Sequence, residues 1–258
     1  MGEQATRPQV PVTVRPEPHR ATLGRSIRLL RAFRLEQSDP DFFYGLLARD
    51  TVAQLASYIP LDGAAVVDVG SGAGFFTAAL TAAGARCAGV ECDAGELTAH
   101  GSPPPGSVLG SALALPFGDG TADVTFSSNV LEHVSDPWQM GDEMVRVTRP
   151  GGIVFLSFTN WLSPWGGHET SPWHYLGGDR AAERYARQYG KAPKNRFGES
   201  LFAVSVRDAL AWARSRTDAH LVDALPRYHP RWAKAVIRIP GLREVVTWNL
   251  VLVLRKLA

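Results

Sequence analysis

Residues 66–74 read Val-Val-Asp-Val-Gly-Ser-Gly-Ala-Gly, and an apolar stretch follows from Phe75 to Leu80. An apolar run that ends in a glycine-rich turn and then opens a helix is typical of a ligand site in a parallel α/β sheet. Glycine lets backbone N–H groups approach a ligand closely, because it has no Cβ. The stretch therefore predicts an α/β fold with a bound ligand at the carboxyl ends of its strands.

The spacing of the glycines argues against a dinucleotide as that ligand. A dinucleotide fingerprint places a third glycine five positions after the first, and here that position is Phe75. Asp68, at the mouth of the turn, would repel a pyrophosphate but suits an ammonium or a sulfonium group. S-adenosylmethionine (SAM) carries both of these positive groups, so we predict SAM as the cofactor.

The segment from Asp68 to Gly74 resembles the first motif of class I SAM-dependent methyltransferases, and the resemblance extends to about residue 160. Glu91 ends the second predicted strand, where the family places the acid that binds the ribose hydroxyls. Residues 110–117 resemble the family's adenine loop. The chain is most similar to the type 11 branch, and its last hundred residues resemble uncharacterised actinobacterial members, which implies no particular substrate. The resemblance implies that the cofactor contacts Asp68, Gly70, Gly72, Gly74, Glu91, Cys92, Ser111, Ala112, Leu113 and Asn129.

The adenine loop departs from the family pattern at one position. Where the family usually has Asp, this chain has Ser111. A serine hydroxyl also accepts a hydrogen bond, but it is shorter and neutral. We therefore expect SAM to bind with help from the neighbouring backbone.

Alternating strand and helix patterns continue to about residue 160 and predict a parallel sheet with right-handed crossovers. Strands are expected at 122–128 and 153–157, and two late strands at 219–225 and 249–255 suit an antiparallel hairpin. The resemblance implies a Rossmann-like, seven-stranded, mostly parallel sheet with helices on both faces. We predict a flexible tail at 1–20 and one domain at 21–258, with N-terminal capping helices at 21–59.

Composition limits the classes of partner. The chain has 258 residues, is 45% apolar, and carries 27 basic against 25 acidic residues, so no polyanionic partner is required. It contains neither an apolar run long enough to span a membrane nor an N-terminal secretion signal. Cys87 and Cys92 are too far apart along one strand to form a disulfide. Two reduced thiols, which we expect to be buried, suit a cytoplasmic location.

Two segments combine basic and apolar residues. In 21–37, Leu23, Ile27 and Leu30 recur at helical spacing, and arginines recur every three residues from Arg25 to Arg34. This pattern predicts a helix that caps the cofactor with a solvated arginine face. The alternative is contact with an acidic substrate or with an anionic membrane surface at the inner membrane face. Residues 227–238 are interpreted as a second basic and aromatic patch.

Residues 161–200 break the alternating pattern. The segment is rich in glycine and aromatic residues, among them Trp161, Trp165 and Trp173, and it includes a helical stretch with three arginines. Because it follows the fifth strand, on the cofactor side of the sheet, we interpret it as an insertion that forms a lid over the acceptor. The alternative is that its aromatic side chains form core.

Methyl transfer to a hydroxyl group requires removal of a proton. His133, just past the fourth strand, is a candidate base, and His168 and His174 of the insertion are further candidates. The alternative for each is structural packing. No chelating cluster stands out, so no metal is expected; Glu132 is interpreted as a surface acid and Asp136 as a helix cap.

The residues after the fourth strand limit the acceptor. The segment 127–130 is not the Asp/Asn-Pro-Pro-aromatic motif of base amino methylation, and neither cysteine lies nearby for cytosine methylation. We therefore expect no nucleic acid partner, and an aromatic lid disfavours proteins as substrates. The prediction is O-methylation of a small-molecule or lipid-linked acceptor. The alternative is a SAM-binding regulatory protein without turnover.

Overall fold

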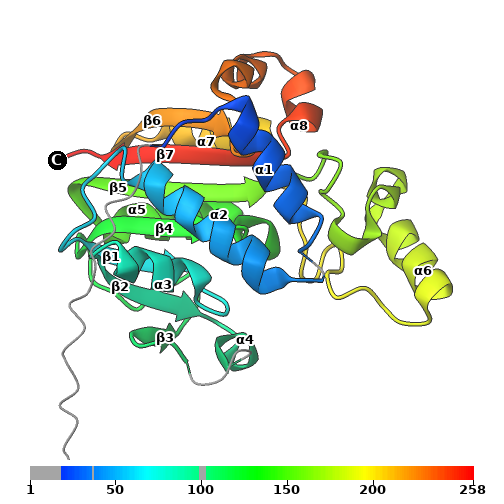
Figure 1. Cartoon of the computed structure of the whole chain (residues 1–258), viewed down its shortest axis with the longest axis horizontal. Coiled ribbons are helices and arrows are strands. Elements are labelled where there is room, and N and C mark those ends of the chain that lie inside the picture. The colour runs from blue at the N-terminus through cyan, green and yellow to red at the C-terminus, as the bar shows by residue number, and fades with distance from the viewer. Residues whose placement is uncertain (1–18, 37, 99–102) are drawn as a thin grey trace, which may run out of the picture.

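The computed structural model describes residues 19–36, 38–98 and 103–258. The predicted flexible tail at 1–20 lies, except for its last two residues, outside this described part. Figure 1 shows a central sheet with helices packed against both faces. A separate helical projection around α6 (Gly178–Tyr189) lies beyond one end of the strands.

The sheet has seven strands in the order β3-β2-β1-β4-β5-β7-β6, which confirms the predicted fold class. β7 runs antiparallel to both β5 and β6, whereas the other neighbouring pairs are parallel. The carboxyl ends of the parallel strands therefore share one edge, where α/β proteins bind ligands. The strands are β1 (Ala65–Val69), β2 (Arg86–Glu91), β3 (Ser107–Leu109), β4 (Ala122–Ser128), β5 (Thr148–Thr159), β6 (Ala219–Pro226) and β7 (Asn249–Lys256).

Two hydrophobic cores lie on opposite faces of the sheet. One packs α1 (Leu23–Phe33), α2 (Pro40–Leu55) and α3 (Phe75–Ala82) against it, and the other packs α5 (Pro137–Val147) and α7 (Val206–Ser215). Asp39 and Asp136 cap α2 and α5 by accepting hydrogen bonds from backbone N–H groups, and a proline follows each. The remaining elements are α4 (Ala94–Thr98), α8 (Leu242–Val246), and the 3₁₀ helices η1 (Leu131–His133), η2 (His168–Thr170), η3 (Trp173–Leu176) and η4 (Arg231–Arg238).

The face that α1 buries differs from the predicted one. Leu23 and Ile27 are 58% and 42% exposed, whereas Arg25 and Leu29 are buried. Arg25 is buried because its guanidinium forms an ion pair with Asp50 of α2, at 2.6 Å. Burial of a charge requires such a partner, so the arginines of this helix do not form one solvated face.

Two further expectations about exposure are wrong. Arg227, interpreted as part of a second basic and aromatic patch, is fully buried, and its guanidinium donates hydrogen bonds to the hydroxyls of Ser128, Ser157 and Thr51. Three hydroxyl partners replace the water that a surface arginine would have. Cys92, expected to be buried, is exposed because it follows the end of β2.

Within the described ranges, no helix is both long enough and apolar enough to cross a membrane.

Candidate cofactor and acceptor site

The glycine turn connects β1 to α3 at the carboxyl edge of the sheet. Gly70, Gly72 and Gly74 all have positive φ angles, of 73°, 49° and 83°. A Cβ on Gly70 would lie 2.3 Å from the Val130 side chain, and one on Gly74 would lie 2.5 Å from Pro104. A Cβ on Gly72 would meet nothing within 4 Å. Gly70 and Gly74 therefore serve packing, whereas Gly72 leaves room for a ligand against the backbone.

Glu91, at the end of β2, is tied to this turn. Its Oε2 accepts a hydrogen bond from the backbone N–H of Gly72 at 3.0 Å. Its Oε1 accepts from the backbone N–H groups of Cys92, at 2.8 Å, and Asp93, at 3.2 Å. The carboxylate is thus held beside the open position at Gly72, with lone pairs left on both oxygens for the hydroxyls of a ribose.

Asp68 is turned into the protein. Its side chain is buried, and Oδ2 accepts a hydrogen bond from the Thr77 hydroxyl at 2.7 Å. Burial raises the pKa of this carboxyl to about 7, although the bonds from Thr77 partly oppose the shift. The geometry gives Asp68 a role in joining β1 to α3; direct contact with the cofactor stays a prediction.

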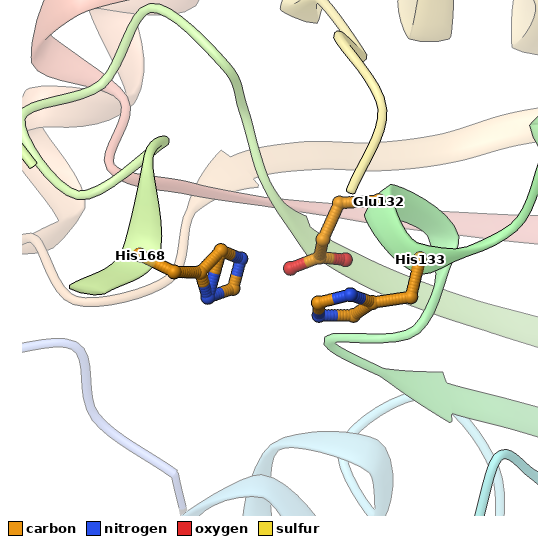
Figure 2. Close-up of side chains that lie close together, drawn as sticks. All are labelled: Glu132, His133 and His168. Atoms are coloured by element: carbon orange, nitrogen blue, oxygen red, sulfur yellow. The ribbon is translucent and has the colours of Figure 1, made fainter. Parts of the chain in front are cut away.

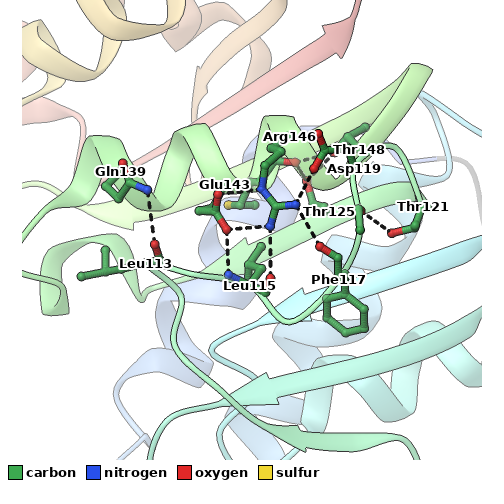
Figure 3. Close-up of polar contacts among 12 residues, drawn as sticks. Leu113, Leu115, Phe117, Asp119, Thr121, Thr125, Gln139, Glu143, Arg146 and Thr148 are labelled. Carbon is green, nitrogen blue, oxygen red and sulfur yellow. Dashed lines mark hydrogen bonds and ion pairs between the residues drawn. The ribbon is translucent and has the colours of Figure 1, made fainter.

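Side chains of α5 hold the predicted adenine loop through hydrogen bonds (Figure 3). Arg146 donates to the backbone carbonyls of Leu115, at 3.1 Å, and Phe117, at 2.9 Å, while Glu143 accepts from the Leu115 N–H at 2.8 Å. The Ser111 hydroxyl accepts from the Leu113 N–H at 3.1 Å. Ser111 is exposed, and this hydrogen bond closes a turn that contains Ala112.

Asn129 follows β4 with a positive φ of 58°, which is uncommon outside glycine. Its N–H donates to the Ser157 carbonyl on β5, and its side-chain oxygen accepts from Asn249 Nδ2 at 2.6 Å. These bonds fix the chain at the carboxyl end of β4, next to Gly70.

Two of the three candidate histidines, His133 and His168, lie close together beside Glu132. Glu132 is only 1% exposed, so its interpretation as a surface acid is wrong. Its side chain points toward the rings of His133 and His168, as Figure 2 shows. The ring centroids of the two histidines lie 4.9 Å apart. The apolar neighbours Val130, Leu131 and Val134 were the sequence signal that this acid lies in the interior.

Burial acts on the acid and on one imidazole of this cluster in opposite directions. Burial raises the pKa of Glu132, and it lowers the pKa of His168 to about 4. Both effects disfavour the charged form. His168 therefore has a neutral ring at neutral pH.

His174 lies apart from this cluster. It is buried within the insertion, between the rings of Trp161 and Tyr175, at centroid distances of 5.2 and 4.1 Å. Its Nδ1 lies 3.4 Å from the Ser171 hydroxyl. These contacts give His174 a packing role; a catalytic role stays a prediction.

The insertion lies beyond the carboxyl edge of the sheet (Figure 1). Its last residue and the residues that follow it run along η1, because Ser200 O lies 2.7 Å from His133 Nδ1 and the Phe202 N–H donates to the Glu132 carbonyl. Lys194 of the insertion forms an ion pair with Glu96 of α4, the helix that follows β2, at 2.9 Å. The insertion therefore contacts both sides of the predicted cofactor position.

A row of aromatic rings leads away from the glycine turn. Successive ring centroids lie 5.0 to 6.2 Å apart along this row. The row contains Phe75, Tyr44, Phe43, Phe33, Trp165 and Trp248. At its far end is an apolar crevice between α1 and the insertion, lined by Leu29, Leu30, Phe33, Trp165, Tyr228 and Trp248. We call it the aromatic crevice.

Known proteins resemble this chain in sequence and in fold. A methyltransferase domain family matches residues 67–156. An uncharacterized methyltransferase of Mycolicibacterium gilvum is 56% identical over 248 residues, covering 92% of this chain and 96% of that protein. Another, from Mycobacteroides abscessus, is 52% identical over 251 residues, covering 92% and 95%.

Two solved structures share the fold. A SAM-dependent methyltransferase from Mesorhizobium loti superposes with a TM-score of 0.54 at 19% identity, covering 81% of this chain and 98% of that one. One from Aquifex aeolicus superposes with a TM-score of 0.51 at 12% identity, covering 89% and 98%.

Proposed function

This chain belongs to the class I SAM-dependent methyltransferases, and on that premise we propose that it methylates a hydroxyl oxygen of an apolar acceptor, either a small molecule or a lipid-linked compound. The observation that carries the proposal is the row of aromatic rings that starts beside the glycine turn and ends at the aromatic crevice. The crevice itself encloses only about 20 Å³, so an apolar part of the acceptor would enter it only if α1 and the insertion moved apart. Aromatic and aliphatic walls favour an acceptor with a large apolar part.

The residues of the glycine turn fit SAM. Gly72 offers open backbone, and Glu91 offers an oriented carboxylate for ribose hydroxyls. The loop that begins at Ser111 would receive the adenine. Bound SAM supplies an electrophilic methyl group, whose bond to sulfur breaks as the bond to the acceptor oxygen forms. The protein's task is to hold the acceptor oxygen in line with that bond and to remove its proton.

Oxygen is favoured as the acceptor atom by the polar group at the end of β4. Glu132, His133 and His168 lie together at the carboxyl edge of the sheet, where the insertion contributes His168. A hydroxyl group loses its proton only with help at neutral pH, and such a cluster provides that help. An already neutral amine would need no comparable group.

A membrane surface is the proposed source of a lipid-linked acceptor. Next to the aromatic crevice, α1, η4 and α8 lie close together, and the Arg231 N–H donates to the Ala21 carbonyl at 2.8 Å. These elements expose apolar side chains, with Trp232 76% exposed. Basic residues surround them, as an anionic membrane would require. We call this surface the membrane-facing patch: Leu23, Ile27, Trp232, Ile239, Leu242 and Val245, with Arg28, Arg31, Arg231 and Arg238.

The alternative is a regulatory protein without turnover. It is disfavoured because the relatives are named methyltransferases and align with this chain over almost their whole length.

The test is methyl transfer from SAM labelled with deuterium in its methyl group. The protein is incubated with the aqueous and the lipid fraction of a cell extract, and products carrying the label are identified by mass spectrometry. We expect labelled methyl ethers in the lipid fraction or among apolar small molecules. Label on nitrogen or carbon, or formation of S-adenosylhomocysteine with neither fraction, would contradict the proposal.

A further inference from the structure

Three side chains converge at the carboxyl end of β4. Two are adjacent in sequence, and the third lies 35 positions further along the chain. Glu132 and His133 come from η1, and His168 comes from the start of η2 in the insertion. One ligand-type atom from each lies within 4.8 Å of the other two. We propose that Glu132, His133 and His168 bind a divalent transition-metal ion of the Zn²⁺ type.

Two of the three side chains have buried polar atoms without a partner. Glu132 Oε1 accepts from the Thr159 N–H at 2.9 Å, but Oε2 is buried with no hydrogen bond. His168 Nε2 is likewise buried and unpartnered. Folded proteins rarely leave such atoms unsatisfied. Because both atoms belong to the same cluster, one ion between them would satisfy both.

The third ligand is already oriented for coordination. His133 Nδ1 lies 2.7 Å from the Ser200 carbonyl oxygen. A carbonyl only accepts, so Nδ1 carries the proton and the lone pair is on Nε2. A carbonyl that holds the far nitrogen of a metal-binding histidine is the usual second layer of a zinc site. His168 supplies a neutral ring.

The backbone also holds His168 in an uncommon conformation. Its φ is 49°, in the left-handed region where residues other than glycine are rare. Strained backbone of this kind persists where the surrounding structure requires one side-chain position, and it gathers at functional sites. Here it coincides with the convergence of His168 on the buried carboxylate, which Figure 2 shows.

The spacing suits an ion with a moderate adjustment. Ligand atoms about 2.1 Å from a tetrahedral ion lie roughly 3.4 Å from one another, so side-chain rotations would bring the three atoms inward from the 4.8 Å limit. Two imidazoles and one carboxylate favour Zn²⁺, Mn²⁺, Fe²⁺ or Co²⁺ over Mg²⁺, which prefers oxygen ligands alone.

Three protein ligands leave a coordination position open, as catalytic metal sites do. If the proposed O-methylation holds, the acceptor hydroxyl occupies this position. A bound ion would lower the pKa of the hydroxyl, so that its proton could pass to water. The oxygen would then form its bond to the methyl group as the methyl–sulfur bond of SAM breaks and S-adenosylhomocysteine leaves. This catalytic use rests on the proposed function, whereas metal binding does not.

Metal binding is tested without SAM, on the full chain from which tags and metals have been removed. Isothermal titration with Zn²⁺, Co²⁺ and Mg²⁺ gives the affinities, and the visible absorption of Co²⁺ reports the geometry. We expect one Zn²⁺ or Co²⁺ per chain and no Mg²⁺. Glu132→Gln and His168→Gln should each weaken binding about a hundredfold or more.

The matched control is His229→Gln. His229 is also a partly buried histidine with an unpartnered ring nitrogen, but it packs against Trp248, outside the cluster. This variant should bind metal as the wild type does. If Glu132→Gln fails to fold, His168→Gln, whose fold is checked by circular dichroism, decides alone.

The outcomes separate the two proposals. Absence of Zn²⁺ and Co²⁺ binding to the wild type would overturn the metal site, as would unchanged affinity in a folded His168→Gln. Metal binding without any methyl transfer would leave the site standing and count against the proposed function. Methyl transfer at the full rate in metal-free protein would overturn the catalytic use of the ion.

Discussion

The carboxylate of Glu91 accepts a hydrogen bond from the backbone N–H of Gly72 at 3.0 Å. This bond joins two motifs that lie on different strands and that the family resemblance treats separately. The glycine turn and the acid predicted to bind the ribose are therefore one structural unit. A change in either residue should alter the ligand contacts of the other.

The first prediction concerns this acid. Glu91→Ala removes the acceptor for ribose hydroxyls and leaves the Gly72 N–H without its partner. The loss should be about 1–3 kcal/mol of SAM binding, which is roughly a 5- to 150-fold rise in Kd. Glu91→Gln, which keeps one carbonyl oxygen, should lose less. Titration calorimetry gives the affinities; equal Kd values for Glu91→Ala and the wild type would remove Glu91 from the site.

The second prediction compares two glycines. Gly72 and Gly63 both have positive φ and both have open space where a Cβ would be built. Alanine at either position should therefore destabilise the fold by a similar amount, about 1–2 kcal/mol. Gly72→Ala alone should also weaken SAM binding, because only Gly72 lies in the predicted cofactor site. Affinity that falls equally in Gly63→Ala would show that the effect comes from stability.

The third prediction is a pH dependence of stability. Burial raises the pKa of Asp68 to about 7, against about 3.9 in an unfolded chain. Between these values the folded state holds a proton that the unfolded state has lost. The stabilisation from Asp68 is thus complete below pH 4 and disappears as the pH rises through 7.

Asp68→Asn has no such titration. The difference in unfolding free energy between wild type and variant should therefore shift in favour of the variant from pH 5 to pH 8. Urea unfolding at both pH values measures it. A constant difference would show that Asp68 is ionised throughout this range.

The fourth prediction concerns the membrane-facing patch. Trp232 is 76% exposed on η4, so Trp232→Ser removes apolar surface without opening the core. The variant should float less with vesicles that contain phosphatidylglycerol, and Arg238→Glu should reduce flotation further at low salt. Glu199→Lys, on the insertion, is the control for altered surface charge. Wild-type protein that does not float with anionic vesicles would exclude this surface as a docking site.

Local pattern predicted the elements better than the contacts between them. The run from Val66 to Gly74 and the late strands at 219–225 and 249–255 are confirmed, because each depends on neighbours along the chain. The buried state of Arg25 depends on Asp50, 25 positions away, and that of Arg227 on hydroxyls 70 to 176 positions away. A charge pattern read along one segment does not contain these partners.

The absence of long-range partners from local sequence also explains which parts of the candidate site could be predicted. The glycine turn and Glu91 were predicted, since both end strands that share one edge of the sheet. The meeting of His133 with His168 depends on the path of the insertion, which has no repeating pattern to indicate it. Glu132 is buried beside β5, where its carboxylate accepts a hydrogen bond from the Thr159 N–H. This partner lies 27 positions away and cannot be seen in the local sequence.

The last prediction tests the aromatic crevice. Trp165 lies between Phe33 of α1 and Trp248, with ring centroids 5.1 and 6.2 Å away, and it lines the crevice. Trp173, of the same insertion, instead lies against the Arg184 guanidinium at 3.8 Å, outside the crevice. Both tryptophans are about 40% exposed, at 40% and 41%. Their replacement by alanine should therefore affect folding to a similar extent.

Trp165→Ala should raise the KM for the acceptor about tenfold or more, because it removes a wall of the crevice and roughly 1.5–3 kcal/mol of apolar contact. SAM affinity should stay unchanged, since the cofactor binds to other segments. Trp173→Ala should leave both quantities near the wild-type values. Steady-state kinetics with the acceptor found by isotope labelling, together with SAM titration, distinguishes the two. Loss of SAM binding and activity together in Trp165→Ala would show that the ring supports the fold, and the crevice would then have no claim to the acceptor.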